Sequence, residues 1–367
     1  MKILIIGSGF SGSVVAERLS QDARNSIVVI EERDHIGGNC YTERDTKTDI
    51  MVHKYGPHIF HTSNKIIWDY INSFDTIVPF INKVKSVYNN NVYSLPINLH
   101  TINQFYNRNL SPNEAIAFVN EISDKSITNP QNFEEQALKL IGKDLYNAFF
   151  YGYTKKQWGT EPKNLPASIL NRLPVRFNYN DNYFNDLYQG IPKNGYTAIF
   201  EKLLSRKNIK VELNTAFDPS FPTKEFDKVV YTGPIDKYFN YKHGRLGYRT
   251  IFFEKEYTDG DFQGNAVINY ADSSVPFTRI HEHKHFASWE NHNNTVIFKE
   301  YSKETDANDI PYYPKRLVAD INILQLYKEE VDKLKDVHFL GRLATYRYLD
   351  MHQIIEEAIL LSNSLKL

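Results

Sequence analysis

The stretch MKILIIGSGFSG, residues 1–12, decides the fold. Its run Lys2–Ile6 is short, apolar and rich in β-branched residues, which is typical of a buried parallel strand. Three glycines follow at once with the spacing Gly-x-Gly-x-x-Gly, and a helical pattern of apolar residues begins behind them. A second buried strand, 27–30, ends in Glu31. This order of strand, glycine turn, helix and strand predicts a βαβ unit that binds a dinucleotide.

Each glycine of the turn has a physical task in such a unit. Gly7 permits the tight turn, Gly9 lets backbone amides approach a pyrophosphate, and Gly12 allows close packing of the helix on the strand. The positive N-terminus of the helix then faces the phosphates. Glu31 is placed to accept hydrogen bonds from a ribose diol, and its charge argues against NADP, whose 2′-phosphate it would repel.

Further segments favour FAD over NAD. Glu32-Arg33 and Gly37-Gly38-Asn39 resemble the second glycine signature of the glutathione-reductase-like flavoproteins, in which paired glycines let the backbone approach the flavin. Phe339-Leu340-Gly341-Arg342 resembles the late strand of those proteins that meets the ribityl chain and pyrophosphate. Asp350-Met351 heads a helix whose N-terminus stabilises negative charge on a reduced isoalloxazine. We therefore expect FAD as the cofactor.

The bulk composition is that of a globular protein without a strong charge bias. The chain has 367 residues and a formal net charge of -1, and its length predicts about two or three domains. No global field attracts nucleic acid or an acidic membrane, so local arginines must hold an anionic substrate. The single cysteine, Cys40, excludes an internal disulfide and fits a reducing cytoplasm. No apolar run approaches the ~20 residues of a membrane-spanning helix.

The order of patterns along the chain predicts an α/β protein with three nested parts. Both chain ends build the Rossmann-like FAD-binding domain, a middle segment rich in amphipathic helical stretches is an insertion, and strand-rich segments form an antiparallel-sheet substrate domain. The predicted ranges are 1–64, 190–245 and 320–367 for the FAD-binding domain, 65–165 for the mostly helical insertion, and 166–190 with 246–319 for the substrate domain.

Two missing motifs narrow the class of flavoenzyme. No second Gly-x-Gly-x-x-Gly stands in the middle of the chain, so we expect no dedicated NAD(P)H domain. No Cys-x-x-Cys is present, which excludes disulfide reductase chemistry. A flavin without a partner for its electrons indicates an oxidase, or a reaction without net redox change.

Eight longer motifs follow one another along the whole chain. They are His53-Lys-Tyr-Gly-Pro-His58-Ile-Phe-His61-Thr, Tyr151-Gly-Tyr153-Thr-Lys-Lys-Gln-Trp158-Gly, Leu173-Pro-Val-Arg176-Phe, Asp181-Asn-Tyr183-Phe, Tyr188-Gln-Gly-Ile-Pro, Tyr231-Thr-Gly-Pro-Ile-Asp236, Gly264-Asn-Ala-Val-Ile-Asn269 and Tyr346-Arg-Tyr348-Leu-Asp-Met351-His352-Gln353. At nearly constant spacing, these motifs resemble those of the bacterial UDP-galactopyranose mutases.

The resemblance implies an isomerase that interconverts UDP-galactopyranose and UDP-galactofuranose, the sugar donor for bacterial surface polysaccharides. It implies a reduced FAD whose N5 acts as the nucleophile on the anomeric carbon while UDP leaves, with no net redox change. The protein must then hold UDP, exclude water and stabilise charge on the diphosphate. The family also suggests a homodimer.

The resemblance assigns the diphosphate to two arginines, Arg172 and Arg249. A planar guanidinium offers bidentate contacts to phosphate oxygens and stays charged at any working pH. Arg172 follows the apolar segment Ile169-Leu170, which suits a lid residue that closes on the substrate. His58 and His61 are expected against the flavin, where they position the sugar. No carboxylate or cysteine completes a ligand set with the two histidines, so we expect no metal.

The remaining site residues are implied by the resemblance. Phenols donate hydrogen bonds without adding charge, and their rings shield those bonds from water. The further substrate residues are Asn82, Tyr153, Trp158, Tyr183, Asn269, Arg279, Tyr313 and Tyr348, with Arg279 near the sugar or flavin. The expected cofactor residues are Gly7, Gly9, Phe10, Ser11, Gly12, Glu31, Glu32, Arg33, Gly38, Asn39, His58, Ile59, Phe217, Arg342, Asp350, Met351 and Gln353.

Other functions stay open from the sequence. A relative acting on the N-acetylated sugar, UDP-N-acetylgalactosamine, differs little in these motifs. A flavin amine- or porphyrin-type oxidase shares the expected fold, although it needs an apolar tunnel, whereas two arginines and a set of tyrosines suit a diphosphate. A non-catalytic nucleotide-binding protein would leave the segments at the flavin edge without a purpose.

Overall fold

The computed structural model describes residues 1–172 and 175–366, with the side chains of residues 168, 171 and 172 outside the described part. Its first layer is a five-stranded parallel sheet with the strand order β10-β2-β1-β11-β17. The strands are β1 (Lys2–Ile6), β2 (Ser26–Ile30), β10 (Ile209–Glu212), β11 (Lys228–Tyr231) and β17 (Val337–Phe339). Distant parts of the chain thus build one nucleotide-binding sheet, which confirms the predicted Rossmann-like fold.

The apolar run at the N-terminus becomes the centre of this sheet. β1 pairs with β2 on one side and with β11 on the other, and Ile3 and Ile5 are completely buried. Three helices pack on one face of the sheet: α1 (Phe10–Ser20), α7 (Gly195–Leu203) and α10 (Met351–Leu365). A Cβ on Gly12 would lie 2.0 Å from the carbonyl oxygen of Gly7, so a larger residue would push α1 away from β1.

The second layer is a seven-stranded sheet with the order β16-β12-β15-β14-β13-β7-β8. Its strands are β7 (Val84–Tyr88), β8 (Asn91–Leu95), β12 (Tyr248–Asp259), β13 (Val267–Tyr270), β14 (Arg279–Glu282), β15 (Asn294–Glu304) and β16 (Tyr313–Pro314). Neighbours are antiparallel except β13 and β7, which run parallel. The register puts Arg279 opposite Asn269 on one side and opposite Glu300 on the other. Polar residues of three adjacent strands therefore share one line across the sheet.

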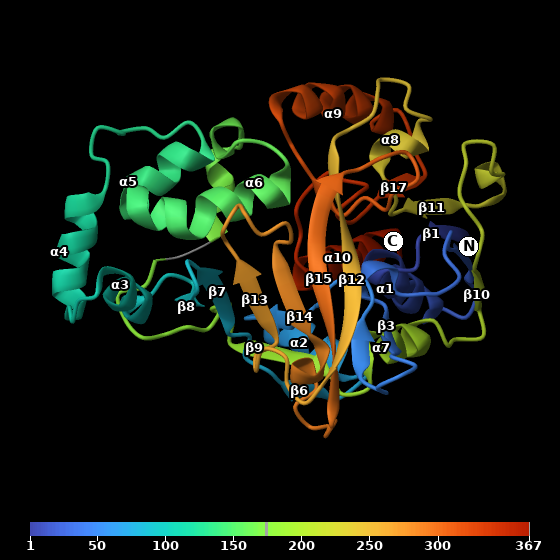
Figure 1. Cartoon of the computed structure of the whole chain (residues 1–367). Helices are drawn as coiled ribbons and strands as arrows, with labels where there is room; N and C mark the ends of the chain where they lie inside the picture. The colour runs from blue at the N-terminus through green and yellow to red at the C-terminus, as the bar shows by residue number, and fades with distance from the viewer. Residues whose placement is uncertain (173–174, 367) are drawn as a thin grey trace.

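Four helices form a separate body around one apolar core: α3 (Leu99–Tyr106), α4 (Pro112–Ile122), α5 (Phe133–Tyr146) and α6 (Gly152–Trp158). This body lies at the left of Figure 1, and the seven-stranded sheet stands between it and the five-stranded sheet at the right. The helical insertion was predicted to span residues 65–165, but the helices of this body begin only at Leu99. Before it, α2 (Lys65–Asn72) buries Ile67 and Ile71 in the core of the five-stranded sheet, and β7 and β8 join the seven-stranded sheet.

Short elements connect these layers. β3 (Thr42–Arg44) pairs with β4 (Met51–His53), and β9 (Tyr188–Pro192) lies between β5 (Phe60–Thr62) and β6 (Ile77–Pro79). The helices α8 (Ile235–Tyr238) and α9 (Val318–Val331) complete the fold. Within the described residues, every helix is too short or too polar to cross a membrane.

Candidate active site

The glycine turn forms a cradle of bare backbone at the start of α1. Gly9 is the N-cap of α1. A Cβ on Gly38 would lie 3.2 Å from the Cα of Gly9. Gly7 and Gly38 have φ angles of 101° and 55°, which glycine adopts without strain. Two backbone segments therefore approach each other at a helix N-terminus, and such a place attracts an anionic diphosphate.

Glu31, at the end of β2, is fixed at the rim of this cradle. Its Oε2 accepts hydrogen bonds from the main-chain N–H of Ser8 at 2.9 Å and from the Ser8 hydroxyl at 2.8 Å. Its Oε1 accepts from the N–H of Arg33 at 3.1 Å. A carboxylate oxygen takes more than one hydrogen bond, so the buried Glu31 retains capacity for a ribose hydroxyl.

Unpartnered buried donors border the same cradle. In the described part of the chain, Nη1 of Arg33 and Nε of Arg342 are buried and have no hydrogen-bond partner. Gly341, which precedes Arg342, approaches α1 so closely that a Cβ there would lie 2.2 Å from Oγ of Ser11. Buried donors without partners are rare in proteins. Together with the bare backbone, they fit a dinucleotide cofactor of the FAD type.

Three residues predicted to bind the cofactor have other surroundings. Glu32 is exposed, and its carboxylate pairs with Nζ of Lys237 at 2.7 Å. The rings of Phe10 and Phe217 are buried in the apolar cores on opposite faces of the five-stranded sheet. The main chain is therefore the part of these two phenylalanines that is available to a cofactor.

The start of α10 faces the cradle. Asp350 is the N-cap of this helix, and its N–H donates to Oε1 of Gln353 at 2.9 Å in a capping box. The Met351 sulfur lies 3.7 Å from that of Cys40, which follows the second glycine pair. Burial raises the pKa of Cys40 to about 12, so its thiol stays protonated.

Tyrosines and arginines from several elements form one polar cluster, here called the tyrosine cluster: Tyr153, Tyr183, Tyr313, Tyr348, Arg279 and Arg342. Arg279 lies close enough to the first three to interact electrostatically with their phenol groups. The rings of Tyr313 and Tyr348 stack with centroids 5.9 Å apart, and the Arg342 guanidinium carbon lies 4.8 Å from the centre of Tyr348. Because Arg342 borders the cradle, the tyrosine cluster extends from the cofactor site to Arg279.

The phenols of the tyrosine cluster are neutral hydrogen-bond donors. Burial raises the pKa of Tyr153 and of Tyr313 above the usual tyrosine range. Burial lowers the pKa of Arg279, as it would for any buried cation. The charge of Glu300 and the neighbouring phenols together outweigh burial and raise this pKa above its ordinary value. Arg279 therefore stays charged among neutral donors, as recognition of a diphosphate requires.

Arg249, which was also predicted to hold the diphosphate, uses its donors inside the protein. Nε donates to the carbonyl oxygen of Gln157 at 3.0 Å and Nη1 to Oε1 of Glu304 at 3.0 Å. Its side chain is only 3% exposed. A Cβ on Gly159 would lie 2.3 Å from Nη1. Arg249 thus ties the end of α6 to β12, and its role as a phosphate ligand stays a prediction.

Two other predicted substrate residues flank this region. Arg172 ends the short 3₁₀ helix Ala167–Arg172, and its side chain lies outside the described residues. Trp158 is half-buried at the end of α6, where it packs at the margin of the helical core.

Asn82 and Asn269 lie beside the tyrosine cluster with unused acceptors. The Oδ1 atoms of both are buried without a hydrogen-bond partner in the described part of the molecule. Asn269 is the register neighbour of Arg279, and the carbonyl oxygen of Asn82 accepts from the N–H of Tyr183 at 2.8 Å. Both amides are therefore positioned to accept hydrogen bonds from sugar or base groups.

The two predicted histidines have different partners. Nδ1 of His58 lies 2.8 Å from the carbonyl oxygen of Gly56, so this nitrogen carries the proton and Nε2 is an acceptor. Burial lowers the pKa of His58 to about 4, which keeps the ring neutral near pH 7. Nδ1 of His61 lies 2.6 Å from Oδ2 of Asp186, and its ring stacks on Phe184 at 3.7 Å. Ile59, between the two histidines, is buried in an apolar cluster.

Sequence reasoning missed three charged residues beside the site. Asp186 orients His61, and Oε1 of Glu300 accepts from Nε of Arg279 at 2.9 Å. Lys156 donates to four carbonyl oxygens in the segment 270–277, at 2.7 to 3.0 Å, and so ties α6 to the loop before β14. For Glu300, the available signal was its place two residues after Phe298 and four after Val296, on the apolar face of a strand, where an unpaired charge would be costly.

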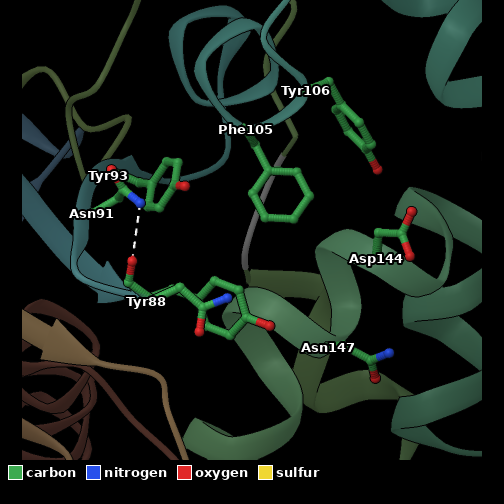
Figure 2. Close-up of a pocket in the computed structure, with 8 residues that line it drawn as sticks. Tyr88, Asn91, Tyr93, Phe105, Tyr106, Asp144 and Asn147 are labelled. Atoms are coloured by element: carbon green, nitrogen blue, oxygen red, sulfur yellow. Dashed lines mark hydrogen bonds between the residues drawn. The ribbon is translucent and has the colours of Figure 1, made fainter.

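Acidic groups and cavities also occur away from this site. Asp261, Glu282 and His285 are close enough to share a metal ion. However, Glu282 already accepts from the N–H groups of residues 262–264, and Lys284 pairs with Asp261. A cavity of about 510 Å³ lies between the β7–β8 hairpin and the helical body. Figure 2 shows Tyr88, Phe105 and other side chains that line it. None of the predicted site residues lines this cavity.

Known proteins resemble this chain over almost its whole length. A sequence profile of the UDP-galactopyranose mutase family matches residues 148–348, and one described as an NAD(P)-binding Rossmann-like domain matches residues 5–74. A probable UDP-galactopyranose mutase of Klebsiella pneumoniae is 53% identical over 97% of this chain and 92% of that protein. A dTDP-fucopyranose mutase of Escherichia coli is 50% identical over 98% of this chain and 96% of that protein.

The fold has a solved counterpart. A crystal structure of reduced UDP-galactopyranose mutase superimposes with a TM-score of 0.74 over all of this chain and 93% of that one, at 13% sequence identity. At this identity the superposition demonstrates a common fold.

Proposed function

The chain belongs to the UDP-galactopyranose mutase family, and we propose that it interconverts UDP-galactopyranose and UDP-galactofuranose on a reduced FAD without net redox change. The observation that carries this proposal is the tyrosine cluster, which joins a charged, partly buried Arg279 to the cofactor cradle through Arg342. Such a path suits a sugar held next to the cofactor while its diphosphate is bound further away. The product would serve as a donor for surface polysaccharide.

The cofactor and the protein have separate tasks in this reaction. Reduced FAD, when bound, supplies a nucleophilic nitrogen for the anomeric carbon. Arg279 stabilises the charge that develops on the departing diphosphate, and the phenols of Tyr153 and Tyr313 donate to its oxygens. We assign Arg172 to the same diphosphate because of its position in the family motif. The buried surroundings exclude water, which strengthens each of these contacts.

The histidines hold protons at defined atoms. Nδ1–H of His58 is engaged with Gly56, so its neutral ring offers Nε2 as an acceptor for a sugar hydroxyl or for the cofactor edge. Asp186 engages Nδ1 of His61, which fixes the ring and leaves Nε2 as its nitrogen for a contact with the substrate. With a pKa of about 4, His58 orients the sugar rather than acting as a general acid near neutral pH.

A second candidate substrate is a dTDP-sugar. The dTDP-fucopyranose mutase is nearly as similar to this chain as the UDP-galactopyranose mutase relative, at 50% against 53% identity. Fucopyranose lacks the 6-hydroxyl of galactopyranose, and thymidine differs from uridine by a methyl group and a missing 2′-hydroxyl. An enzyme with few contacts to these positions would accept both. UDP-N-acetylgalactosamine is the third substrate to compare.

We further propose that the protein works as a homodimer in a reducing cytoplasm. Its one thiol, Cys40, is protonated and stands beside the predicted flavin site, where oxidation would disturb the cradle. Light scattering of the holoenzyme measures the mass directly, and a monomer would contradict the dimer.

The test of function is an anaerobic assay of the FAD-loaded protein, with and without dithionite. Each of the three nucleotide sugars is incubated separately, and the products are separated by chromatography. Ring contraction of UDP-galactopyranose by the reduced protein alone supports the proposal. Conversion of dTDP-fucopyranose alone would assign the second candidate, whereas peroxide release from an amine in air without sugar conversion would indicate an oxidase.

A further inference from the structure

Glu300 is a fully buried acid in the middle of β15. Its side chain is 2% exposed. Oε1 accepts from Nε of Arg279 at 2.9 Å and from the hydroxyl of Thr278 at 3.3 Å, and Oε2 accepts from Nε2 of His281 at 2.9 Å. Two donors from β14 and one from the residue before it thus fix both oxygens of one carboxylate.

The edge of Arg279 that Glu300 engages determines where the guanidinium points. Nε is the donor nearest the backbone, and its bond to a fixed carboxylate sets the plane of the group. The guanidinium lies close enough to Tyr153 and Tyr313 to interact electrostatically with their phenol groups. The two outer nitrogens are therefore presented to the tyrosine cluster.

His281 locks the other side of the carboxylate. Burial lowers the pKa of His281, so its ring is neutral near pH 7 and its proton lies on Nε2, which donates to Glu300. The carboxylate cannot rotate toward Arg279 for a bidentate contact without losing this bond. Glu300 therefore neutralises Arg279 while holding it by one edge only.

We propose that Glu300 is a positioning residue for the sugar-nucleotide reaction: it orients Arg279 so that both terminal nitrogens meet the diphosphate. This inference rests on the proposed function. Glu300 also offsets the positive charge of Arg279. It therefore improves the orientation of the guanidinium but weakens its electrostatic attraction for the diphosphate. Removal of its charge should therefore separate turnover from UDP affinity.

The test is Glu300→Gln in the FAD-loaded protein, with Glu256→Gln as the matched control. Glu256 lies on the same sheet and pairs with Lys299 at the surface. We expect kcat of Glu300→Gln to fall about ten-fold or more while the Kd for UDP, measured by calorimetry, weakens by less than about two-fold. The control should change neither. Loss of UDP binding in proportion to kcat would overturn the proposal, because a loosened site would affect both.

A double-mutant cycle tests whether Glu300 acts through Arg279. In an Arg279→Lys background, Glu300→Gln should change kcat by less than about two-fold. An undiminished effect there would also overturn the proposal. If Glu300→Gln does not accumulate with FAD, His281→Leu replaces it, because this change keeps the Arg279–Glu300 pair but frees Oε2. A kcat lowered about three-fold or more with unchanged UDP affinity supports the proposal, and an unchanged kcat contradicts it.

These readouts separate two failures. If the wild-type protein converts no sugar nucleotide, the proposed function fails. If the wild type turns over but Glu300→Gln leaves kcat unchanged, only the positioning role of Glu300 fails.

Discussion

Arg249 and Arg279 lie on the same seven-stranded sheet, yet the structure uses them in opposite ways. Arg249 directs its donors to the carbonyl oxygen of Gln157 and to Glu304, and so fastens α6 to the sheet. Arg279 is held through Nε alone by the buried Glu300, and its outer nitrogens face phenols. The comparison teaches that an arginine is available to a ligand when the protein satisfies its inner edge and leaves the outer edge free.

The largest effect should follow Arg279→Met. The change removes a charged donor from the place where the diphosphate would develop charge, so we expect kcat/KM to fall about 1,000-fold, or roughly 4 kcal/mol. The cofactor cradle is elsewhere, and the purified variant should keep its FAD absorbance. Steady-state kinetics and the visible spectrum measure both, and a loss below ten-fold would remove Arg279 from its assigned role.

The stability of the protein at low pH should report on the ion pair between Arg279 and Glu300. Burial alone would raise the pKa of Glu300, but Arg279 and His281 bring it from 4.5 to about 2. Because the folded pKa is depressed, the stability from this group is present above pH 4.5 and is lost as the pH falls toward 2, by up to about 3 kcal/mol. Urea unfolding of wild type and Glu300→Gln should therefore converge over this range. Parallel curves would contradict a charged Glu300.

Arg249→Met should affect stability more than binding. It removes the hydrogen bonds to the carbonyl oxygens of Lys156 and Gln157 at the end of α6 and the ion pair with Glu304, so we expect the free energy of unfolding to fall by about 2–3 kcal/mol. The Kd for UDP should stay within about five-fold. The reverse outcome, normal urea unfolding with UDP binding abolished, would restore Arg249 as a diphosphate ligand.

A pair of glycine substitutions isolates the contact between α6 and Arg249. Gly159 and Gly260 have φ angles of 64° and 66°, but a Cβ would lie 2.3 Å from Nη1 of Arg249 at the first and would meet nothing within 4 Å at the second. Both alanine variants carry the left-handed strain of about 1 kcal/mol. Gly159→Ala should lose about 1 kcal/mol more. Equal losses in thermal unfolding would mean that Arg249 moves aside freely.

The sequence predicts local features well because their causes are local. Gly7, Gly9 and Gly12 predicted the turn at the end of β1, where the φ angle of Gly7 and the close contact at Gly12 require glycine. Helix α4 likewise has local causes, because Ser111 and Glu114 form a capping box directly before an apolar periodicity.

Features that depend on distant parts of the chain were harder to predict. Arg249 meets a carbonyl oxygen 92 residues earlier in the sequence, and Glu300 meets Arg279 through the register of two strands. No pattern near either arginine reports these partners, and the assignment of the diphosphate to Arg249, which came from the family resemblance, stays a prediction. The helix α2 was grouped with the helical insertion for the same reason, since its partners lie in the five-stranded sheet.

A crystal structure of the reduced, FAD-loaded protein with UDP would test the central claim most directly. We expect the diphosphate oxygens to lie within hydrogen-bond distance of the terminal nitrogens of Arg279, while Arg249 keeps its bond to Gln157. A diphosphate bound by Arg249, with Arg279 separated from it by protein, would contradict the account.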